Sequence, residues 1–283
     1  MKPQKTQRIQ DGYQDSYLHC ALCTFFPHLV VKNRTTFFCF LLIFCSFTAT
    51  FALSPNDDQN FITSYPNYLA HGFKNILTDR TNQWILGGAA LSTLLLHTYD
   101  DDVQEYASEN GLMSESLSRF LDDYGGWRAY PVGLVVVGIT SYLRSGKESV
   151  VSDMKYYVTA MGVTALITDF LKRSVGRERP NGRGTRSFPT GHTSGSFVLA
   201  SVADELYGHK VGVPAYLLAG FVGLQRIHDN KHWLTDVIAG AALGTIIGRG
   251  FGKAYQKEVT NSRMTIHTKI GGDGIHLMLL LSI

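Results

Sequence analysis

Apolar runs of helical length alternate with polar connections rich in glycine and proline along most of this chain. Such runs predict buried or partly buried helices when turn-forming residues bound them. The predicted helices cover residues 84–99, 130–143, 154–171, 193–206, 213–227 and 234–251, with a short amphipathic helix at 114–123. The pattern therefore predicts an all-α fold, a bundle of about six helices that occupies residues 83–253.

The segments on either side of this helical region have different patterns. Residues 54–82 are polar with scattered aromatic side chains, which predicts a loop-rich segment with a short helix at 68–77. At the other end, residues 254–283 form a tail in which Gly271, Gly272 and Gly274 separate two apolar stretches. A glycine turn between two such stretches predicts a β-hairpin.

The first 53 residues contain an apolar run from Thr35 to Leu53, preceded by Lys32 and Arg34. A basic flank, an apolar centre and small residues near Ala52 are typical of a secretory signal, cleaved here after residue 52. The run of about 19 residues is also long enough to remain as a membrane anchor. We favour export with cleavage, and anchoring is the alternative.

The last predicted helix carries glycine at every fourth position, at Gly240, Gly244 and Gly248. Residues four apart lie on one helical face, and a stripe of small residues permits close approach of a neighbouring helix. We expect this face to lie against another helix of the bundle.

Composition excludes several classes of function. The formal net charge is only +3 and no long basic run is present, which argues against a nucleic-acid partner. All four cysteines lie within the first 45 residues, so the helical region can hold neither a disulfide nor a thiolate metal site. Its apolar runs of about 14–18 residues are short for membrane spans but apolar enough for lipid contact. We favour membrane association, with a soluble periplasmic protein as the alternative.

Three clusters of polar residues lie between positions 172 and 236 and supply candidate chemistry. They are Lys172 with Arg179-Pro180, then Thr190-Gly191-His192, then Arg226 with His232 and Asp236. Lysine and arginine side chains bind the oxygens of an oxyanion, and two histidines can divide nucleophilic and acid–base roles near neutral pH. A carboxylate four residues after a histidine can lie on the same helical face and orient the ring. This set indicates a phosphate-handling site.

The order and spacing of these clusters resemble the three-part signature of the type 2 phosphatidic acid phosphatase superfamily. The superfamily includes bacterial acid phosphatases, lipid phosphate phosphatases and vanadium haloperoxidases. Two positions depart from the usual pattern: Thr190 and Gln225 stand where the family has serine. Threonine keeps the hydroxyl, whereas glutamine changes the reach of one secondary contact.

The resemblance implies a role for each motif residue and a helical bundle with its active site at one end. His232 would be the nucleophile that becomes a phosphohistidine, Asp236 would orient it, and His192 would be the general acid and base. The phosphate would be bound by Lys172, Arg179, Thr190, Gly191 and Arg226. No metal and no cofactor is expected. The implied substrate is a phosphorylated small molecule or lipid, and the implied location is the cell envelope, with the site facing the periplasm.

Several alternatives compete with these roles. The same residues could hold vanadate in a haloperoxidase, or the fold could serve as a non-catalytic binding protein of the envelope. His228, His232 and Asp236 also have the spacing of a zinc site, although a metal would leave the three cations without a purpose. We interpret Asp100, Asp101 and Asp102 as a solvated helix end. Arg177, Arg183 and Arg186 are interpreted as ordinary solvated loop charges.

Overall fold

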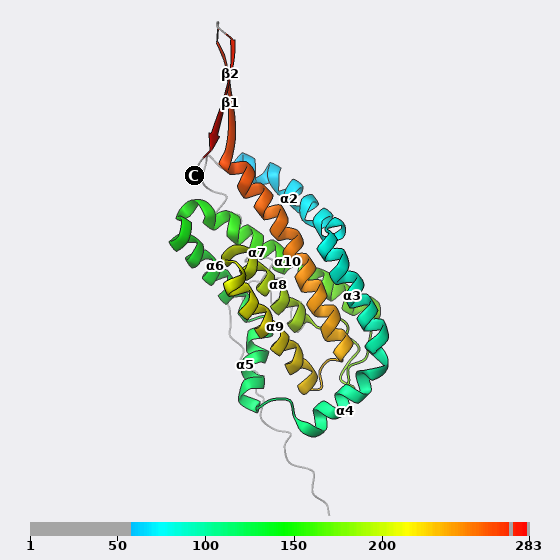
Figure 1. Cartoon of the computed structure of the whole chain (residues 1–283). Helices are drawn as coiled ribbons and strands as arrows, with labels where there is room; N and C mark the ends of the chain where they lie inside the picture. Colours follow the sequence, from blue (N-terminus) through cyan, green and yellow to red (C-terminus); the bar gives the residue numbers. More distant parts are fainter. Residues whose placement is uncertain (1–57, 272–273, 282–283) are drawn as a thin grey trace, which may run out of the picture. The chain divides into compact units, whose positions relative to one another are not determined.

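The computed structural model describes the backbone of residues 58–271 and 274–281, and the side chains of residues 65–147 and 149–261. Figure 1 shows the arrangement of the elements. The helices are α2 (Asp58–Thr78), α3 (Arg80–Leu96), η1 (His97–Tyr99), α4 (Asp100–Asn110), α5 (Glu115–Gly125), α6 (Ala129–Ser145), α7 (Lys147–Val175), α8 (Gly191–Tyr207), α9 (His209–His228) and α10 (Leu234–Arg263). The all-α fold that the apolar pattern predicts is confirmed, although helix α4 lies where the sequence predicts the end of a helix.

Helix α8 lies in the middle of the bundle, packed against α10, α9 and α7. Helix α6 packs on α7, α3 packs on α10, and the short helix α5 packs on α9. More than half of the residues of α8 are buried, among them Val198, Ala200 and Val202. The core of the bundle is therefore built around α8, and the N-terminus of this helix is held from several sides.

The glycine stripe of α10 is the surface on which α8 rests, which confirms the expected close packing. A Cβ atom at Gly244 would lie 2.2 Å from the carbonyl oxygen of Ser194, and one at Gly248 would lie 2.3 Å from Cβ of Ser201. At Gly240 the same atom would lie 2.9 Å from the carbonyl oxygen of Thr190. Only a residue without a side chain fits at these distances, so the stripe determines how closely the two helices approach.

Residues 54–82 differ from the prediction of a loop-rich segment, because Asp58–Thr78 form the continuous helix α2. Tyr68, Gly72 and Ile76 are four residues apart and bury one face of α2. A Cβ at Gly72 would meet the ring of Phe251 on α10. The polar composition and Pro66 concealed this contact, since few of the described side chains of the segment are buried.

After α10 the backbone continues into strands β1 (Met264–Gly271) and β2 (Gly274–Leu281). They pair antiparallel, with Met264 opposite Leu281 and Gly271 opposite Gly274. The predicted signal or anchor at residues 1–53 lies outside the described residues.

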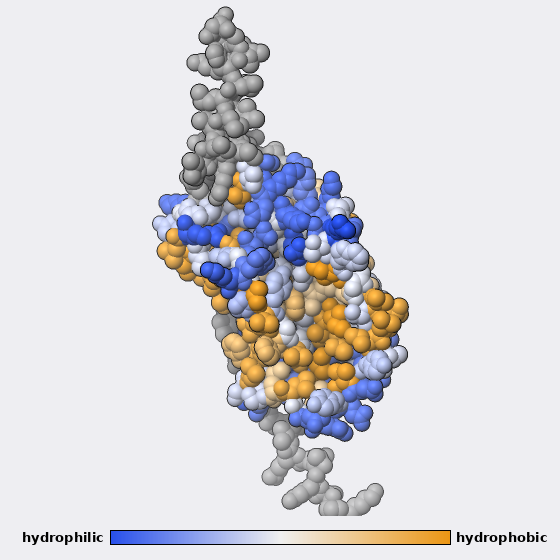
Figure 2. Space-filling model, in the orientation of Figure 1, coloured by the Kyte–Doolittle hydropathy of each residue, from blue (hydrophilic) through white to orange (hydrophobic). Residues whose placement is uncertain are grey.

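Many large apolar side chains face outward on the helices at the edge of the bundle. The most exposed include Trp84, Leu91, Leu94 and Leu95 on α3, Val132, Val135, Ile139 and Leu143 on α6, and Val213, Leu217, Phe221 and Leu224 on α9. Leu94 and Leu143 are 75% and 77% exposed. Figure 2 shows apolar surface gathered on the face where α3, α9 and α10 lie in Figure 1, with polar surface above and below it.

Among the described helices, α10 alone is both long and apolar enough to cross a membrane, over Leu234–Asn261. More than half of its apolar window is buried inside the bundle, so this helix by itself is weak support for a membrane span. The outward-facing side chains of α3, α6 and α9 are the stronger feature, because patches of this extent mark contact with lipid or protein.

The glycine packing generates the first prediction. Substituting Gly244→Ala should lower the free energy of unfolding by about 1–3 kcal/mol or more, because the new methyl group meets backbone that cannot move away. The matched control is Gly220→Ala on α9, where no heavy atom lies within 4 Å of the new Cβ. That variant should be neutral or slightly stabilising. Thermal unfolding of the two purified variants measures the difference, and equal melting temperatures would contradict the packing argument.

Candidate active site

The candidate site lies at the end of the bundle where α7 and α9 terminate and α8 and α10 begin (Figure 1). The sequence dictates this convergence locally. Gly176, with φ of 62°, ends α7, and Thr190 in extended conformation precedes the first residue of α8. Lys172 and Arg226 therefore lie in the last turns of their helices, His192 in a first turn, and His232 in the loop between α9 and α10.

Backbone contacts join the three sequence motifs. The Lys172 ammonium donates to the carbonyl oxygens of Arg186 at 2.9 Å and Ser187 at 3.4 Å, just before the second motif. The Thr190 N–H donates to the carbonyl oxygen of Asp236 at 3.2 Å. A Cβ at Gly191 would lie 3.8 Å from Cε of Lys172. Residues separated by up to about 65 positions in the sequence thus meet at one end of the bundle.

Positive charge is under-compensated in this region. Within the described part of the chain, no carboxylate lies within ion-pair distance of Lys172 or Arg179. Thr190 Oγ1 and Arg226 Nε are buried and have no hydrogen-bond partner among the described residues. Two unpaired cations and two unpartnered polar atoms form a site suited to an oxyanion, which supplies several acceptor oxygens at once.

His232 and Asp236 form a buried pair, with side chains 3% and 0% exposed. The imidazole Nδ1 lies 3.6 Å from Oδ2 of Asp236, longer than a hydrogen bond, and 3.4 Å from Oγ of Ser187. Burial lowers the pKa of His232 to about 4, and the charges of Lys172 and Arg226 act in the same direction. Asp236 raises the pKa of His232, and its effect is smaller than that of burial but larger than that of either cation. The imidazole is therefore neutral at physiological pH, the state that a nitrogen nucleophile requires.

His192 faces a carboxylate on α5. Its Nε2 lies 3.4 Å from Oδ1 of Asp122, and the same oxygen accepts a hydrogen bond from Arg226 and lies 3.6 Å from the Lys231 ammonium. Contact with His192, together with the charges of Arg226 and Lys231, holds the pKa of Asp122 well below its usual range despite its partial burial. One carboxylate oxygen thus bridges the candidate general acid and a candidate phosphate-binding arginine.

Three functional neighbours of the site were not predicted from the sequence: Asp122, Ser187 and Arg177. Asp122 lies 104 residues before Arg226, and no spacing rule connects the two. Ser187 donates to Asp236 from the loop before α8. Arg177 is not the solvated loop charge that we expected, since its side chain is only 20% exposed and pairs with Asp100 and Asp236. The sequence feature that could have indicated this role is the position of Arg177 immediately after Gly176, which ends α7.

Asp100 also differs from the expectation of a solvated helix end. It begins α4, is 2% exposed, and accepts hydrogen bonds from the N–H and hydroxyl of Thr235. An apolar run followed by three carboxylates does not reveal which of them turns inward.

The position occupied by Gln225 retains a contact with the third-motif arginine. Its Oε1 accepts from Arg226 at 3.2 Å, and its amide donates to Asp229 at 2.7 Å. Burial of Gln225 is complete, so its longer side chain is accommodated inside the bundle.

The geometry does not support the zinc alternative. His228 Nδ1 accepts the backbone N–H of Leu112 at 3.2 Å, on the side of the α4–α5 connection. No group of three or more His, Cys, Asp or Glu side chains in the described part of the chain is arranged to hold a metal ion.

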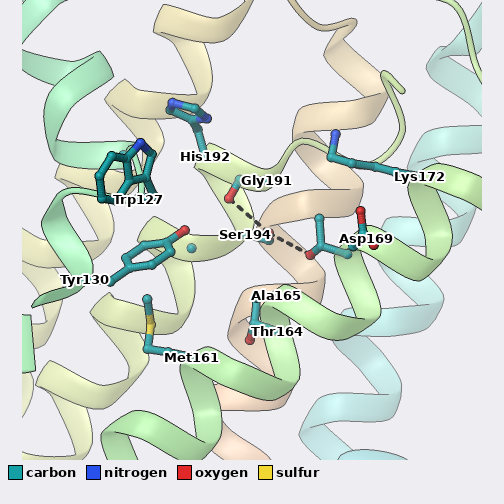
Figure 3. A pocket seen from close by; sticks show the side chains of 13 residues that line it. Trp127, Tyr130, Met161, Thr164, Ala165, Asp169, Lys172, Gly191, His192 and Ser194 are labelled. Carbon is teal, nitrogen blue, oxygen red and sulfur yellow. Dashed lines mark hydrogen bonds between the residues drawn. The ribbon is translucent and has the colours of Figure 1, made fainter. Parts of the chain in front are cut away.

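A pocket of about 280 Å³ extends from the second motif along α6, α7 and α8. Figure 3 shows His192 and Lys172 at one end of it, on either side of Gly191, and Tyr130 and Met161 farther along. Apart from Thr164, Thr168, Asp169 and Ser194, the pocket away from the motif is mainly apolar, lined by Trp127, Tyr130, Met161, Ala165 and Gly195. The pocket therefore combines a cationic end with an apolar wall.

Comparison with known proteins finds a family model that spans the site region. Residues 153–259, which contain all three motifs, match the sequence model of the PAP2 superfamily. Over these residues the chain is similar to the members of that superfamily.

The similarity to individual proteins is limited in identity or in the length that it covers. The chain is 41% identical over 80 residues to lipid A 1-phosphatase of Porphyromonas gingivalis, covering 27% of this chain and 18% of that protein. It is 25% identical over 207 residues to lipid phosphate phosphatase 1 of Arabidopsis thaliana, covering 52% and 62% of the two chains. The chain thus spans less than two thirds of these curated relatives. The crystal structure of a transmembrane PAP2 type phosphatidylglycerolphosphate phosphatase from Bacillus subtilis aligns with 70% of this chain and 96% of its own, with a TM-score of 0.49 and 17% identity.

The burial of His232 generates the second prediction. Its imidazole should stay neutral until the pH falls to about 4, because protonation would place a charge in a buried site beside two cations. Titration of the ¹⁵N-labelled histidines by NMR measures this, with His232→Asn identifying the resonance. A His232 resonance that titrates near 6.5, the value of a free imidazole, would contradict the proposed environment.

Proposed function

We propose that this chain is a phosphatase of the cell envelope that hydrolyses a lipid phosphate or lipid pyrophosphate through a phosphohistidine intermediate, without a metal ion. The observation that carries the proposal is the meeting of unpaired cations with two imidazoles, one of them buried and neutral beside a carboxylate. Phosphoryl transfer needs mainly positioning and charge stabilisation, and these residues supply both.

In the first half-reaction, Nε2 of His232 forms a bond to phosphorus while the bond to the leaving oxygen breaks. Burial lowers the pKa of His192, and the negative charge of the bound phosphoryl group offsets this by favouring the protonated imidazole. His192 then donates its proton to the leaving oxygen, which departs as an alcohol from a lipid phosphate or as the lipid monophosphate from a lipid pyrophosphate. Lys172, Arg179 and Arg226 bind the phosphoryl oxygens, and the donors at Thr190 and Gly191 add to them at the N-terminus of α8. Asp236 stabilises the positive charge that develops on His232.

In the second half-reaction, a water molecule attacks phosphorus and the P–N bond breaks. His192, now neutral, accepts the proton of this water, and His232 returns to its neutral state. Inorganic phosphate leaves, and both histidines have recovered their starting protonation. The cycle needs no oxidant, reductant or co-reactant besides water.

The lipid substrate class is supported by two features of the chain. The pocket beside His192 and Lys172 has an apolar wall on α6, α7 and α8, suited to the first part of an acyl or prenyl chain. Apolar side chains also face outward on α3, α6 and α9, as expected of helices in contact with a bilayer. The proteins named above as similar include a lipid A 1-phosphatase and a lipid phosphate phosphatase, which fits the same class.

We assign the site to the periplasmic side of the envelope membrane, on the basis of the N-terminal run that indicates export. A carbonate wash of cell membranes distinguishes an integral or anchored protein from a soluble periplasmic one. Cysteine residues introduced at the end of the bundle that carries the site can then be treated with a membrane-impermeant thiol reagent. Their labelling in intact cells shows on which side of the membrane the site lies.

The mechanism generates the third prediction. His232→Ala should reduce phosphate release by about 10³-fold or more, because the nucleophile is lost. His192→Ala should reduce it by about 10²–10⁴-fold, because the leaving oxygen is no longer protonated. Orthovanadate should inhibit the wild-type chain and EDTA should not. Activity that survives in His232→Ala would refute the phosphohistidine mechanism, and inhibition by EDTA alone would restore the metal alternative.

The pocket generates the fourth prediction. Ala165→Phe should lower kcat/KM about tenfold for a lipid phosphate and leave a soluble monoester nearly unaffected, because the ring fills the apolar wall away from the phosphate. Suitable substrates are phosphatidic acid, phosphatidylglycerophosphate, undecaprenyl pyrophosphate and lipid A, compared with a soluble aryl phosphate.

The matched control is Leu166→Phe. Leu166 is the next residue on α7, is 54% exposed, and does not line the pocket. Equal losses in the two variants, or equal losses on both substrate types, would argue against a lipid chain in this pocket.

A further inference from the structure

Arg177 occupies a place between two helices that the catalytic roles described above leave unexplained. Its Nη1 donates to Oδ1 of Asp236 at 2.8 Å and to the Thr235 hydroxyl at 2.7 Å. Its Nη2 donates to Oδ2 of Asp100 at 2.6 Å. The guanidinium therefore joins a carboxylate of α4 to a carboxylate of α10, and it lies 5.3 Å from the ring centre of Trp233.

The contacts of Asp236 divide its two oxygens between different partners. Oδ1 accepts a hydrogen bond from Arg177. Oδ2 accepts from the Ser187 hydroxyl and from the Trp233 N–H at 3.0 Å, and it faces the imidazole of His232. Rotation of the carboxylate would break all of these contacts together. Arg177 thus determines which oxygen faces His232.

Asp100 completes the arrangement from the other side. It accepts from the N–H of Thr235 at 3.0 Å and from the Thr235 hydroxyl, so it holds the first turn of α10 from which Asp236 projects. Arg177, Asp100 and Thr235 together fix the start of this helix. Of the two carboxylates that Arg177 joins, one is Asp236, which lies beside His232.

Resting on the proposed function, we propose that Arg177 is a positioning residue for the reaction. Through Asp236 it orients the carboxylate toward His232 and offsets its negative charge, so that the resting imidazole remains an uncharged nucleophile. Arg177 does not contact the substrate and acts through Asp236. Asp100 also pairs with the guanidinium, which limits the effect of the Arg177 charge on Asp236.

The charged groups that face His232 come from several elements. They are Lys172 from α7, Arg226 from α9 and Asp236 from α10, with Arg177 acting behind Asp236. His97 is also close to this network, with Nδ1 3.3 Å from Nη2 of Arg177 and 3.2 Å from Asp100, but its side chain is 68% exposed. Removing Arg177 leaves Asp236 free to stabilise a protonated His232.

Two substitutions test the proposal because their effects should differ in direction. Arg177→Met should raise the pH at which His232 becomes protonated by about one unit, because a compensating positive charge is lost. Asp100→Asn should leave that pH unchanged or lower it, because the charge of Arg177 then acts on Asp236 alone. General damage to the fold would move both variants in the same direction.

The measurement is an NMR titration of ¹⁵N-labelled histidine in the full chain in detergent micelles, together with the pH dependence of kcat/KM. In Arg177→Met the acidic limb of kcat/KM should move upward with the titration of His232. Arg177→Lys keeps the charge but offers a single ammonium in place of the fork, so it should retain the wild-type titration with reduced kcat.

Arg173→Met is the matched control. Arg173 lies on the last turn of α7, its side chain is 50% exposed, and it pairs with Asp169 one turn earlier. This variant should change neither the titration nor kcat. If Arg177→Met does not fold, the opposite behaviour of Asp100→Asn and the retained titration of Arg177→Lys decide the question.

An unchanged His232 titration in folded Arg177→Met would overturn the positioning role. The proposed function has a separate test, because the titration of His232 does not depend on activity. A wild-type chain that releases no phosphate from any lipid substrate would refute the phosphatase, whatever the titration of the variants shows.

Discussion

The structure depends on the close packing of α8 against the glycine face of α10. Because Gly240 and Gly244 have no side chains, the backbone of α8 approaches near enough for the Thr190 N–H to bond the Asp236 carbonyl oxygen. That contact aligns the beginnings of two helices, and each beginning carries part of the site. If the helices were farther apart, His192 and His232 would still lie at one end of the bundle. Their positions relative to each other would no longer be fixed by this contact.

Much of the helical region could be predicted from the sequence. Long apolar runs fix the existence of helices, and the four-residue spacing of Gly240, Gly244 and Gly248 identifies a packing face without any structure. The motif residues are recognisable because their order and separation are specific, and the structure brings Lys172, Thr190, Gly191 and Asp236 together through backbone contacts. In residues 54–82 the predicted short helix at 68–77 lies within α2, but the helix begins earlier, at Asp58, where the polar composition and Pro66 predicted a loop.

The contacts that support the site were not predictable in the same way. Asp122, Ser187 and Arg177 act through pairs distant in sequence, and a single charged residue gives no periodic signal. From the sequence, Arg177 and Asp100 were interpreted as surface charges, because charged residues are rarely buried unless they are paired. Their pairing depends on how α4 meets α10, which is a property of the assembled bundle. The sequence therefore identifies the groups proposed to contact a phosphate more readily than the residues that position those groups.

The position of Asp122 has a consequence for how the site exchanges anions. Its carboxylate oxygen already satisfies Arg226 and lies beside His192 and Lys231. If Arg226 binds a phosphoryl group as proposed, that group would replace or join an internal anion instead of meeting an unpaired guanidinium. In the proposed reaction the ligand would compete with the Asp122 carboxylate for Arg226, and small anions such as the phosphate product would be bound more weakly. A substrate with an additional apolar anchor tolerates this competition better than a small ion does.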